Sequence, residues 1–164
     1  MDPITENYAF IDGQNLHLGV RDIGWIIDYK KFRIYLKEKY NVEKAFYFIG
    51  YNDTQENLYA SLKKDGFELI FKPTHISIDG TLKGNCDAEL VMHCILEIEN
   101  YNKAVIVAND GDYYSLIKYL RENRKLRTVL VPNTIKMSKL IPEASLNQFS
   151  SLENVMDKIG YAKI

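Results

Sequence analysis

Acidic side chains recur beside short apolar segments that have the composition of β-strands. Asp12, Asp110 and Asp112 each follow such a segment, and Asp87 stands at the start of a long apolar stretch with helical character. Carboxylate oxygens are hard ligands that suit Mg²⁺ and Mn²⁺. A carboxylate-held metal pair can activate water and stabilise the leaving oxygen in phosphodiester hydrolysis.

Each acid also has a simpler structural explanation. Asp87, Asp110 and Asp112 lie near predicted helix N-termini, where a carboxylate caps free N–H groups and meets the helix dipole favourably. Asp12 is harder to explain as a cap, because it ends an apolar strand and is followed by Gly13. If the four acids meet, they need a cation or protons, since two unit charges about 4 Å apart repel by roughly 4 kcal/mol at an effective dielectric near 20.

The elements that must position these acids alternate along the chain between strands and helices. Strands are predicted at 8–12, 44–50, 67–72, 103–108 and 126–132, and helices at 28–40, 54–65, 85–101 and 112–123, with short helices near 135–141 and 152–159. Asp28 is a plausible N-cap, and Gly66 follows a helix C-terminus. The segment 74–84 is predicted to be a loop or a small hairpin that turns at Asp79-Gly80.

The predicted fold class is α/β with a parallel sheet and helices on both faces. The strands at 103–108 and 126–132 contain apolar residues without alternation, which is typical of strands covered on both sides. Alternating strands and helices with right-handed crossovers give a doubly wound sheet. Function in such sheets lies at the carboxyl ends of the strands, and an order of 3-2-1-4-5 would place Asp12 beside Asp110.

Composition indicates a single domain over residues 1–164. The chain is 46% hydrophobic and 26% charged, its apolar runs are too short to span a bilayer, and no secretory signal is visible. Cys86 and Cys94, eight residues apart, are expected to be reduced thiols in a cytoplasmic protein. The net charge of −1 argues against a tight, passive duplex binder. The basic stretch at 118–127 could lie beside nucleic acid or form a solvated helix end.

Several other functional classes lack their motifs. The sequence has no G-x-x-x-x-G-K-[ST] loop for nucleotides and no G-x-G-x-x-G after a strand. Lys72-Pro73 stands where a response-regulator receiver would place its phospho-acceptor aspartate. The three histidines are scattered, and no His/Cys spacing indicates zinc.

Three motifs stand in order along the chain. They are Phe10-Ile11-Asp12-Gly13-Gln14-Asn15-Leu16, Lys83-Gly84-Asn85-Cys86-Asp87 and Val105-Ile106-Val107-Ala108-Asn109-Asp110-Gly111-Asp112-Tyr113. Together they resemble the motifs of NYN domains, the LabA-like branch of the PIN-like nuclease superfamily. The resemblance covers about residues 7–150. It implies a PIN-like three-layer fold with a parallel sheet of order 3-2-1-4-5. It also implies an Mg²⁺- or Mn²⁺-dependent ribonuclease site that leaves 5′-phosphate and 3′-hydroxyl ends.

The resemblance also assigns roles to individual residues. By motif position, the acidic catalytic and metal-ligating residues would be Asp12, Asp87, Asp110 and Asp112. Asn15 would hold the site or touch a phosphate, and Lys83 and Tyr113 are further candidates for substrate contact. Lys83 could equally be a solvated loop lysine. The chain departs from the commoner pattern at Ala108, where a serine is usual, and at Asn109, where a glycine is usual.

The sequence therefore predicts a metal-dependent endoribonuclease that acts on RNA, expected to be single-stranded. The competing interpretation is a PIN-like module that binds RNA or a protein with little or no hydrolysis. The intact acids favour the enzyme, whereas the near-zero net charge and the changes at Ala108 and Asn109 favour the module. Whether the chain forms a homo-oligomer is left open.

Overall fold

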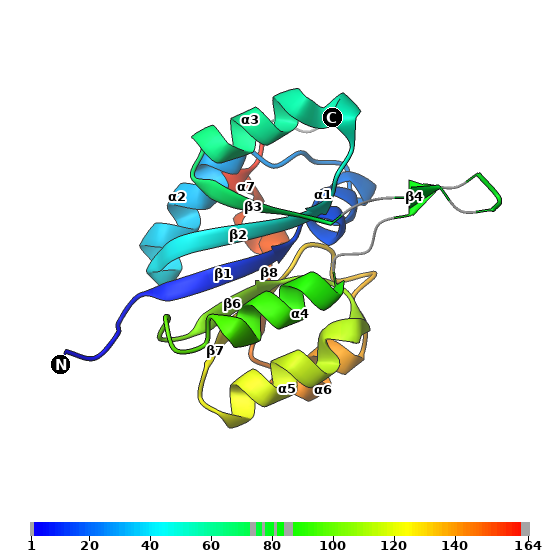
Figure 1. Ribbon diagram of the computed structural model, residues 1–164. Helices are drawn as coiled ribbons and strands as arrows, with labels where there is room; N and C mark the ends of the chain where they lie inside the picture. Colours follow the sequence, from blue (N-terminus) through cyan, green and yellow to red (C-terminus); the bar gives the residue numbers. More distant parts are fainter. Residues whose placement is uncertain (1, 73–74, 77, 81, 84–86, 162–164) are drawn as a thin grey trace.

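The computed structural model describes residues 2–72, 75–76, 78–80, 82–83 and 87–161, with the side chains of 75–76 and 82–83 excepted. These residues form a six-stranded parallel sheet between two layers of helices (Figure 1). The strand order is β3-β2-β1-β6-β7-β8. Because β4 and β5 lie outside this sheet, β6 and β7 are its fourth and fifth strands in chain order. The predicted α/β class and the 3-2-1-4-5 order are confirmed, and β8 extends the sheet by one strand.

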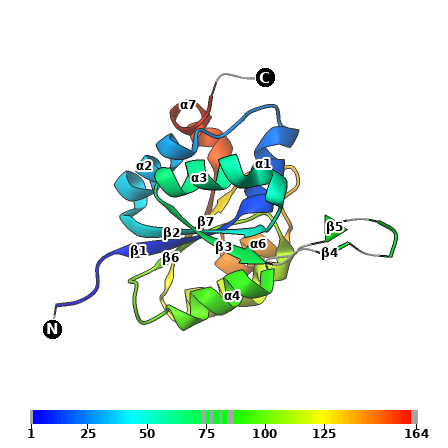
Figure 2. The ribbon, with the colours of Figure 1, turned by 45° about the horizontal axis from the view of Figure 1, so that its top comes forward.

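The strands of the main sheet are short and pair in parallel. Their bounds are β1 Asn7–Asp12, β2 Val42–Gly50, β3 Phe67–Lys72, β6 Ala104–Val107, β7 Leu126–Val131 and β8 Phe149–Ser151. Two further strands, β4 His75–Ile76 and β5 Leu82–Lys83, form an antiparallel hairpin that projects from the body (Figures 1 and 2). Gly80 in its turn has a φ of 84°, a conformation that glycine adopts without steric cost.

The helices cover the sheet on both faces (Figure 2). One face is covered by α1 Gly13–Asp22, α2 Tyr29–Tyr40, α3 Glu56–Lys64 and α7 Met156–Ile159, and the other by α4 Asp87–Leu96, α5 Tyr114–Glu122 and α6 Leu140–Ser145. Three 3₁₀ turns are also described, η1 Asp53–Gln55, η2 Gly111–Tyr113 and η3 Leu152–Val155. None of the described helices is both long and apolar enough to cross a membrane.

Two apolar cores explain why the central strands show no polar alternation. Phe10 and Ile106 point into the core under α4, α5 and α6, whereas Ile11 and Val107 point into the core under α1, α2 and α3. All four side chains have no exposed surface. The strands are therefore apolar on both faces, as parallel strands between helices must be.

Helix α1 was not predicted from the sequence, because two glycines lower its helix propensity. It forms because Asp12 caps its N-terminus and because Leu16 and Val20 pack fully into the core. Gly13 is needed at the start of the helix. A Cβ there would lie 2.9 Å from the Phe48 carbonyl oxygen, and it would also collide with the Tyr47 ring.

The ends of other elements also differ from expectation. Helix α4 ends at Leu96 rather than at residue 101, because Lys125 Nζ donates to the Ile98 and Tyr101 carbonyls, at 2.9 and 2.6 Å, and holds that segment as a turn. The helix predicted at 135–141 is instead a loop followed by α6, and β8 precedes η3 and α7 in the tail. A three-residue strand such as β8 is too short to give a periodic signal.

The thiol of Cys94 is free and buried, and burial raises its pKa to about 12. Such a thiol is not reactive near neutral pH. Cys86 lies outside the described residues, so the expectation for the two cysteines together stays a prediction.

Candidate metal centre

The carboxyl ends of β1 and β6 bring acids from distant parts of the chain to one edge of the sheet. The two strands are adjacent and parallel, with Ile11 opposite Val107. Asp12 is the last residue of β1, and Asp110 follows β6 as the N-cap of η2. The expected adjacency of these two strand ends is therefore present.

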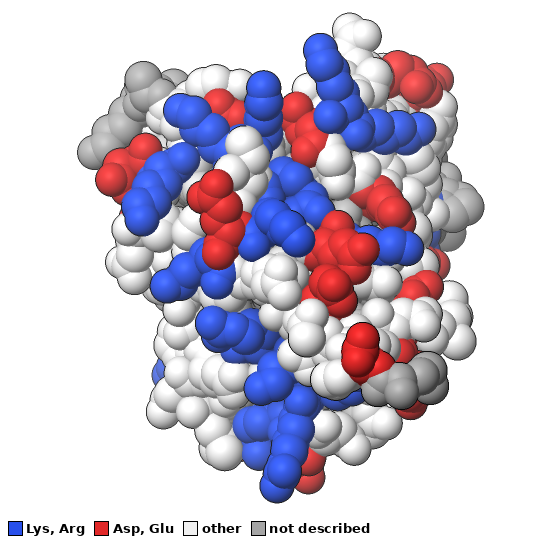
Figure 3. All heavy atoms as spheres, turned by 90° about the vertical axis from the view of Figure 1, so that its left-hand side faces the viewer, with Lys and Arg blue, Asp and Glu red and all other residues white. Residues whose placement is uncertain are grey.

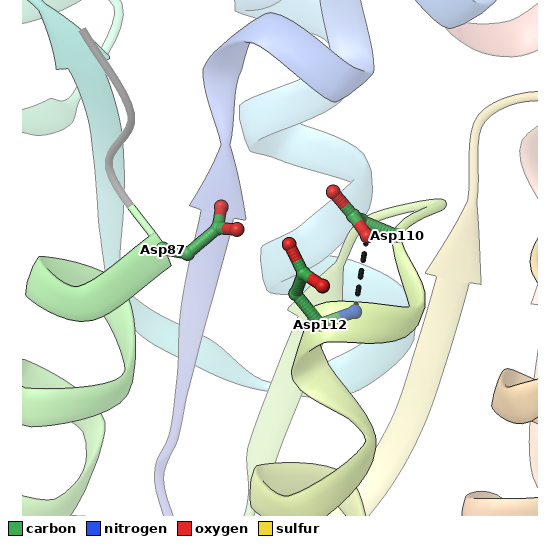
Figure 4. A group of neighbouring side chains, drawn as sticks. All are labelled: Asp87, Asp110 and Asp112. Carbon is green, nitrogen blue, oxygen red and sulfur yellow. Dashed lines mark hydrogen bonds between the residues drawn. The ribbon is translucent and has the colours of Figure 1, made fainter.

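Asp87, Asp110 and Asp112 form the tightest group of acids among the described residues. Each offers a carboxylate oxygen, and these oxygens all lie within 4.8 Å of one another. Figure 4 shows the three side chains meeting from the first turn of α4 and from η2. A hydrogen bond with Asp87 and the negative charge of Asp87 raise the pKa of Asp112. The group therefore has the electrostatic strain that a bound cation would relieve.

Asp110 also has a capping role. Its Oδ1 accepts a hydrogen bond from the Asp112 backbone N–H at 3.0 Å. One oxygen thus stabilises the 3₁₀ turn while the carboxylate stays within the acidic group. The cap and the ligand interpretations of Asp110 are therefore compatible.

Asp12 lies behind this group and is only 5% exposed. Its Oδ1 accepts from the Asn15 backbone N–H at 3.0 Å, and its Oδ2 accepts from the Tyr113 hydroxyl at 2.8 Å. Burial raises the pKa of Asp12, and the charges of Asp87 and Asp110 raise it further, against the opposing effect of the two hydrogen bonds. Asp12 therefore holds a proton more tightly than an exposed aspartate does.

Tyr113 connects Asp12 to the acidic group. Its hydroxyl oxygen lies 2.8 Å from Asp12 Oδ2 and 2.9 Å from Asp87 Oδ1. A hydroxyl has one proton and donates to one acceptor at a time. The contacts with Asp12 and Asp87 can therefore both be hydrogen bonds only when one of these acids is protonated and donates to the tyrosine oxygen. The ring is fully buried and leaves no face for a base to stack on. The structure thus places Tyr113 as a link between acids and not on the surface where a substrate contact was expected.

Amide side chains hold the loop that carries Asp110. Asn15 Oδ1 accepts from the Asn109 N–H at 2.9 Å, which ties α1 to the end of β6. Asn109 Oδ1 accepts from the Asn133 N–H at 3.2 Å, and the Asn109 carbonyl accepts from the Ser138 N–H at 3.0 Å. The asparagine at position 109 therefore joins three segments of the chain at the site. Ala108 is buried and offers no hydroxyl.

The structure can place only one of the two basic groups that the sequence offered for contact with RNA. The side chain of Lys83 lies outside the described part of the chain, as do residues 84–86 of the second motif. The stretch at 118–127 lies at the opposite end of the sheet, because α5 returns the chain to the amino end of β7. Of the two interpretations of this stretch, contact with nucleic acid bound at the acids is therefore wrong, and a solvated helix end agrees with its position. Arg121 Nε instead donates to the Ala144 carbonyl at 2.8 Å. The face at that end mixes Lys and Arg with Asp and Glu (Figure 3).

A groove beside the acids contains residues that the sequence did not indicate. It has a volume of about 620 Å³ and is lined by Gln14, Asn15, Leu18, Gly19, Asp22, Asn109, Asp110, Gly111, Asp112, Lys136, Ser138 and Leu140. Lys136 lies in the loop after β7, and no motif or charge run marks it in the sequence. Lys136 reaches the groove because this loop packs against α1, a contact that local sequence does not predict.

The donor set fits a hard divalent cation. The candidate ligands are carboxylates from two segments of the chain, with oxygens close enough to share one ion. Mg²⁺ and Mn²⁺ prefer such oxygen ligands. Among the described residues, no histidine or cysteine belongs to this group, so a soft metal is disfavoured.

The buried charge of Asp12 leads to a pH-dependent prediction for Asp12→Asn. Because the folded-state pKa of Asp12 is raised, its contribution to stability is present below about pH 4 and is lost as the pH rises through the folded value. Asparagine keeps the capping oxygen, and its NH₂ can donate to the Tyr113 oxygen as a protonated carboxyl would. Metal-free Asp12→Asn should therefore be at least as stable as the wild type at pH 7, with the difference shrinking in acid. Urea unfolding in EDTA at both pH values measures this, and a variant less stable at pH 7 would contradict it.

Comparison with known proteins is consistent with this geometry. The NYN domain family model matches residues 8–153. The low amplitude and bright protein LabA of Synechococcus elongatus is 26% identical over 131 residues, covering 74% of this chain and 70% of that protein. A solved structure of a protein of unknown function from Vibrio parahaemolyticus has a TM-score of 0.79 at 20% identity, covering 98% of this chain and 99% of the other. At that identity the likeness concerns the fold alone.

Proposed function

The chain belongs to the NYN domain family, within the PIN-like nuclease superfamily, and from that premise we propose that it is a divalent-metal-dependent endoribonuclease. The observation that carries the proposal is the group of Asp87, Asp110 and Asp112, whose oxygens lie within 4.8 Å of one another at the carboxyl edge of the sheet. This is the edge at which doubly wound sheets bind their ligands. The proposed catalytic domain is the whole chain, 1–164.

The acids have different parts in this proposal. Asp87, Asp110 and Asp112 hold the cation, and Asp12 supports them from its buried position through the Tyr113 hydroxyl. A bound Mg²⁺ or Mn²⁺ supplies Lewis-acid stabilisation of the charge that develops on the phosphoryl oxygens. Asn15 keeps the Asp110 loop at a fixed distance from α1, and it lines the groove where a phosphate contact is proposed.

Metal-dependent cleavage of single-stranded RNA tests the proposal. A mixed-sequence RNA labelled at its 5′ end should be cut internally in Mn²⁺ or Mg²⁺ and should stay intact in EDTA, with activity restored by excess metal. The products should carry 5′-phosphate and 3′-hydroxyl ends. RNA that binds and stays intact under all metal conditions would favour the non-catalytic module over the enzyme.

A further inference from the structure

The groove beside the acids has two walls that run away from the candidate metal centre. One wall is a stripe along α1 from Gln14 to Asp22, and the other is formed by η2 and the loop that carries Lys136 and Ser138. Since an α-helix rises about 1.5 Å per residue, the α1 wall is roughly 12 Å long. The groove is therefore long enough to hold a small ligand next to the acids.

Close packing fixes the walls of the groove. A Cβ at Gly19 would lie 2.9 Å from the Pro132 side chain, so α1 and the loop after β7 approach as closely as a glycine allows. A Cβ at Gly111 would lie 2.5 Å from Ser138 Oγ and 3.0 Å from Leu140 Cδ1. The Asn133 side chain also donates from Nδ2 to the Gly19 carbonyl at 3.2 Å. The groove is therefore formed by fixed contacts between these segments.

The chemistry of the lining changes along the groove. Asp110 and Asp112 lie at one end, where a divalent cation is proposed, and the ion pair of Lys136 and Asp22 contributes to the lining as well. Among the described lining residues, Lys136 is the only Lys or Arg. Leu18 and Leu140 contribute apolar surface, and Leu140 is 43% exposed. A ligand that alternates anionic groups with flat apolar groups would match this order.

Lys136 is held by a partner that a phosphate could replace. Its Nζ lies 2.5 Å from Asp22 Oδ2, and the lysine side chain is 62% exposed. This hydrogen bond lowers the pKa of Asp22. Exposed ion pairs contribute little to stability, and an ammonium group has three donors. A phosphate oxygen can therefore compete for Lys136 at small cost to the fold.

We propose that this groove holds the nucleotide adjoining the scissile phosphate of single-stranded RNA, with its base against Leu18 and Leu140, and that Lys136 leaves Asp22 to bind the next phosphate. This inference rests on the proposed ribonuclease function and adds the substrate position to it. Recognition of an unpaired nucleotide in a groove is typical of proteins that bind single-stranded RNA.

Two variants that break the same ion pair distinguish this role from a structural one. Lys136→Gln removes the phosphate contact, whereas Asp22→Asn frees Lys136 and removes a competing anion. The affinity for a fluorescent mixed-sequence 8-nucleotide RNA should therefore fall several-fold in Lys136→Gln and rise in Asp22→Asn. Binding is measured in Ca²⁺, which accepts the same oxygen ligands, with a gel to show that the RNA stays intact. The logarithm of the RNA association constant falls linearly with the logarithm of the salt concentration. The magnitude of this slope should decrease by about 0.7 in Lys136→Gln, because one phosphate contact is lost.

The outcomes separate this inference from the proposed function. If both variants change RNA affinity equally, or neither does, the ion pair is only structural and the groove assignment is overturned. Mn²⁺-induced thermal stabilisation of the same proteins reports on the acids independently of the groove. A wild type that is stabilised by Mn²⁺ and cuts RNA, with the two variants alike, would overturn the groove assignment alone. A wild type that neither gains stability from Mn²⁺ nor binds RNA would overturn both.

Discussion

Asp110→Asn is expected to lower RNA cleavage by orders of magnitude while leaving the metal-free protein at least as stable as the wild type. Asparagine caps a helix about as well as aspartate, and its side-chain oxygen can still accept from the Asp112 N–H. The substitution removes one charge from a group of acids whose oxygens lie within 4.8 Å of one another. Repulsion in the metal-free state should therefore decrease, and a metal ligand should be weakened.

Thermal unfolding with and without Mn²⁺, together with an RNA cleavage assay, measures both effects. A ligand that binds the native state stabilises it, so Asp110→Asn should lose most of the Mn²⁺-induced increase in Tm. Asp28→Asn is a matched control, because Asp28 caps α2 through the Lys31 N–H and does not belong to the group of three acids. The control should keep its Mn²⁺ response and its cleavage rate. An Asp110→Asn protein that melts earlier without metal, gains stability from Mn²⁺ and still cuts RNA would show that Asp110 is only structural.

Tyr113→Phe is expected to lower the free energy of unfolding of the metal-free protein by about 1–3 kcal/mol, the usual cost of removing the partner of a buried polar group. The variant takes away the hydroxyl that donates to Asp12 Oδ2 and lies 2.9 Å from Asp87 Oδ1. The fully buried ring stays the same size, so packing is preserved. Because Asp12 and Asp87 lose their common partner, the acids should be less well positioned. The Mn²⁺ concentration needed for half-maximal cleavage should increase.

Urea unfolding and a Mn²⁺ titration of cleavage test this role of Tyr113. Tyr119→Phe removes a hydroxyl from an exposed tyrosine on α5 and should change neither quantity. If Tyr113→Phe changes neither the free energy of unfolding nor the Mn²⁺ concentration needed for half-maximal cleavage, the hydroxyl does not support the acids. A loss of stability alone would limit Tyr113 to a role in the fold.

The resemblance to NYN domains was sufficient for the order of five strands and for the edge of the sheet at which the acids lie, but β8 was missed. Short apolar runs identify the central strands, and the rules for parallel crossovers then place the residues after β1 and β6 at one edge. The contacts that support the acids depend on packing between distant segments. Asn109 meets Asn133 because two loops lie side by side, and Tyr113 is buried because α4 packs over it. Neither contact follows from local pattern.

The position of the basic residues shows a different limit. The stretch at 118–127 was considered for nucleic-acid contact on charge alone, although a helix that follows a parallel strand must return to the amino end of the next strand. Topology therefore separates Arg121 from the acids. Lys136 lies near them because the loop after β7 folds back on α1 and meets Asp22, a contact across 114 residues of sequence. The distribution of charged residues along the sequence does not predict such a contact in the fold.

The most direct test of the proposed metal site is a crystal structure of the protein soaked with Mn²⁺, with the cation located by its anomalous scattering. We expect Mn²⁺ between the carboxylates of Asp87, Asp110 and Asp112 in the wild type, and a weaker or absent signal in Asp110→Asn. If Mn²⁺ is missing from these three side chains at saturating concentration, in a protein that still cuts RNA in an EDTA-sensitive manner, this group of acids does not hold the catalytic metal.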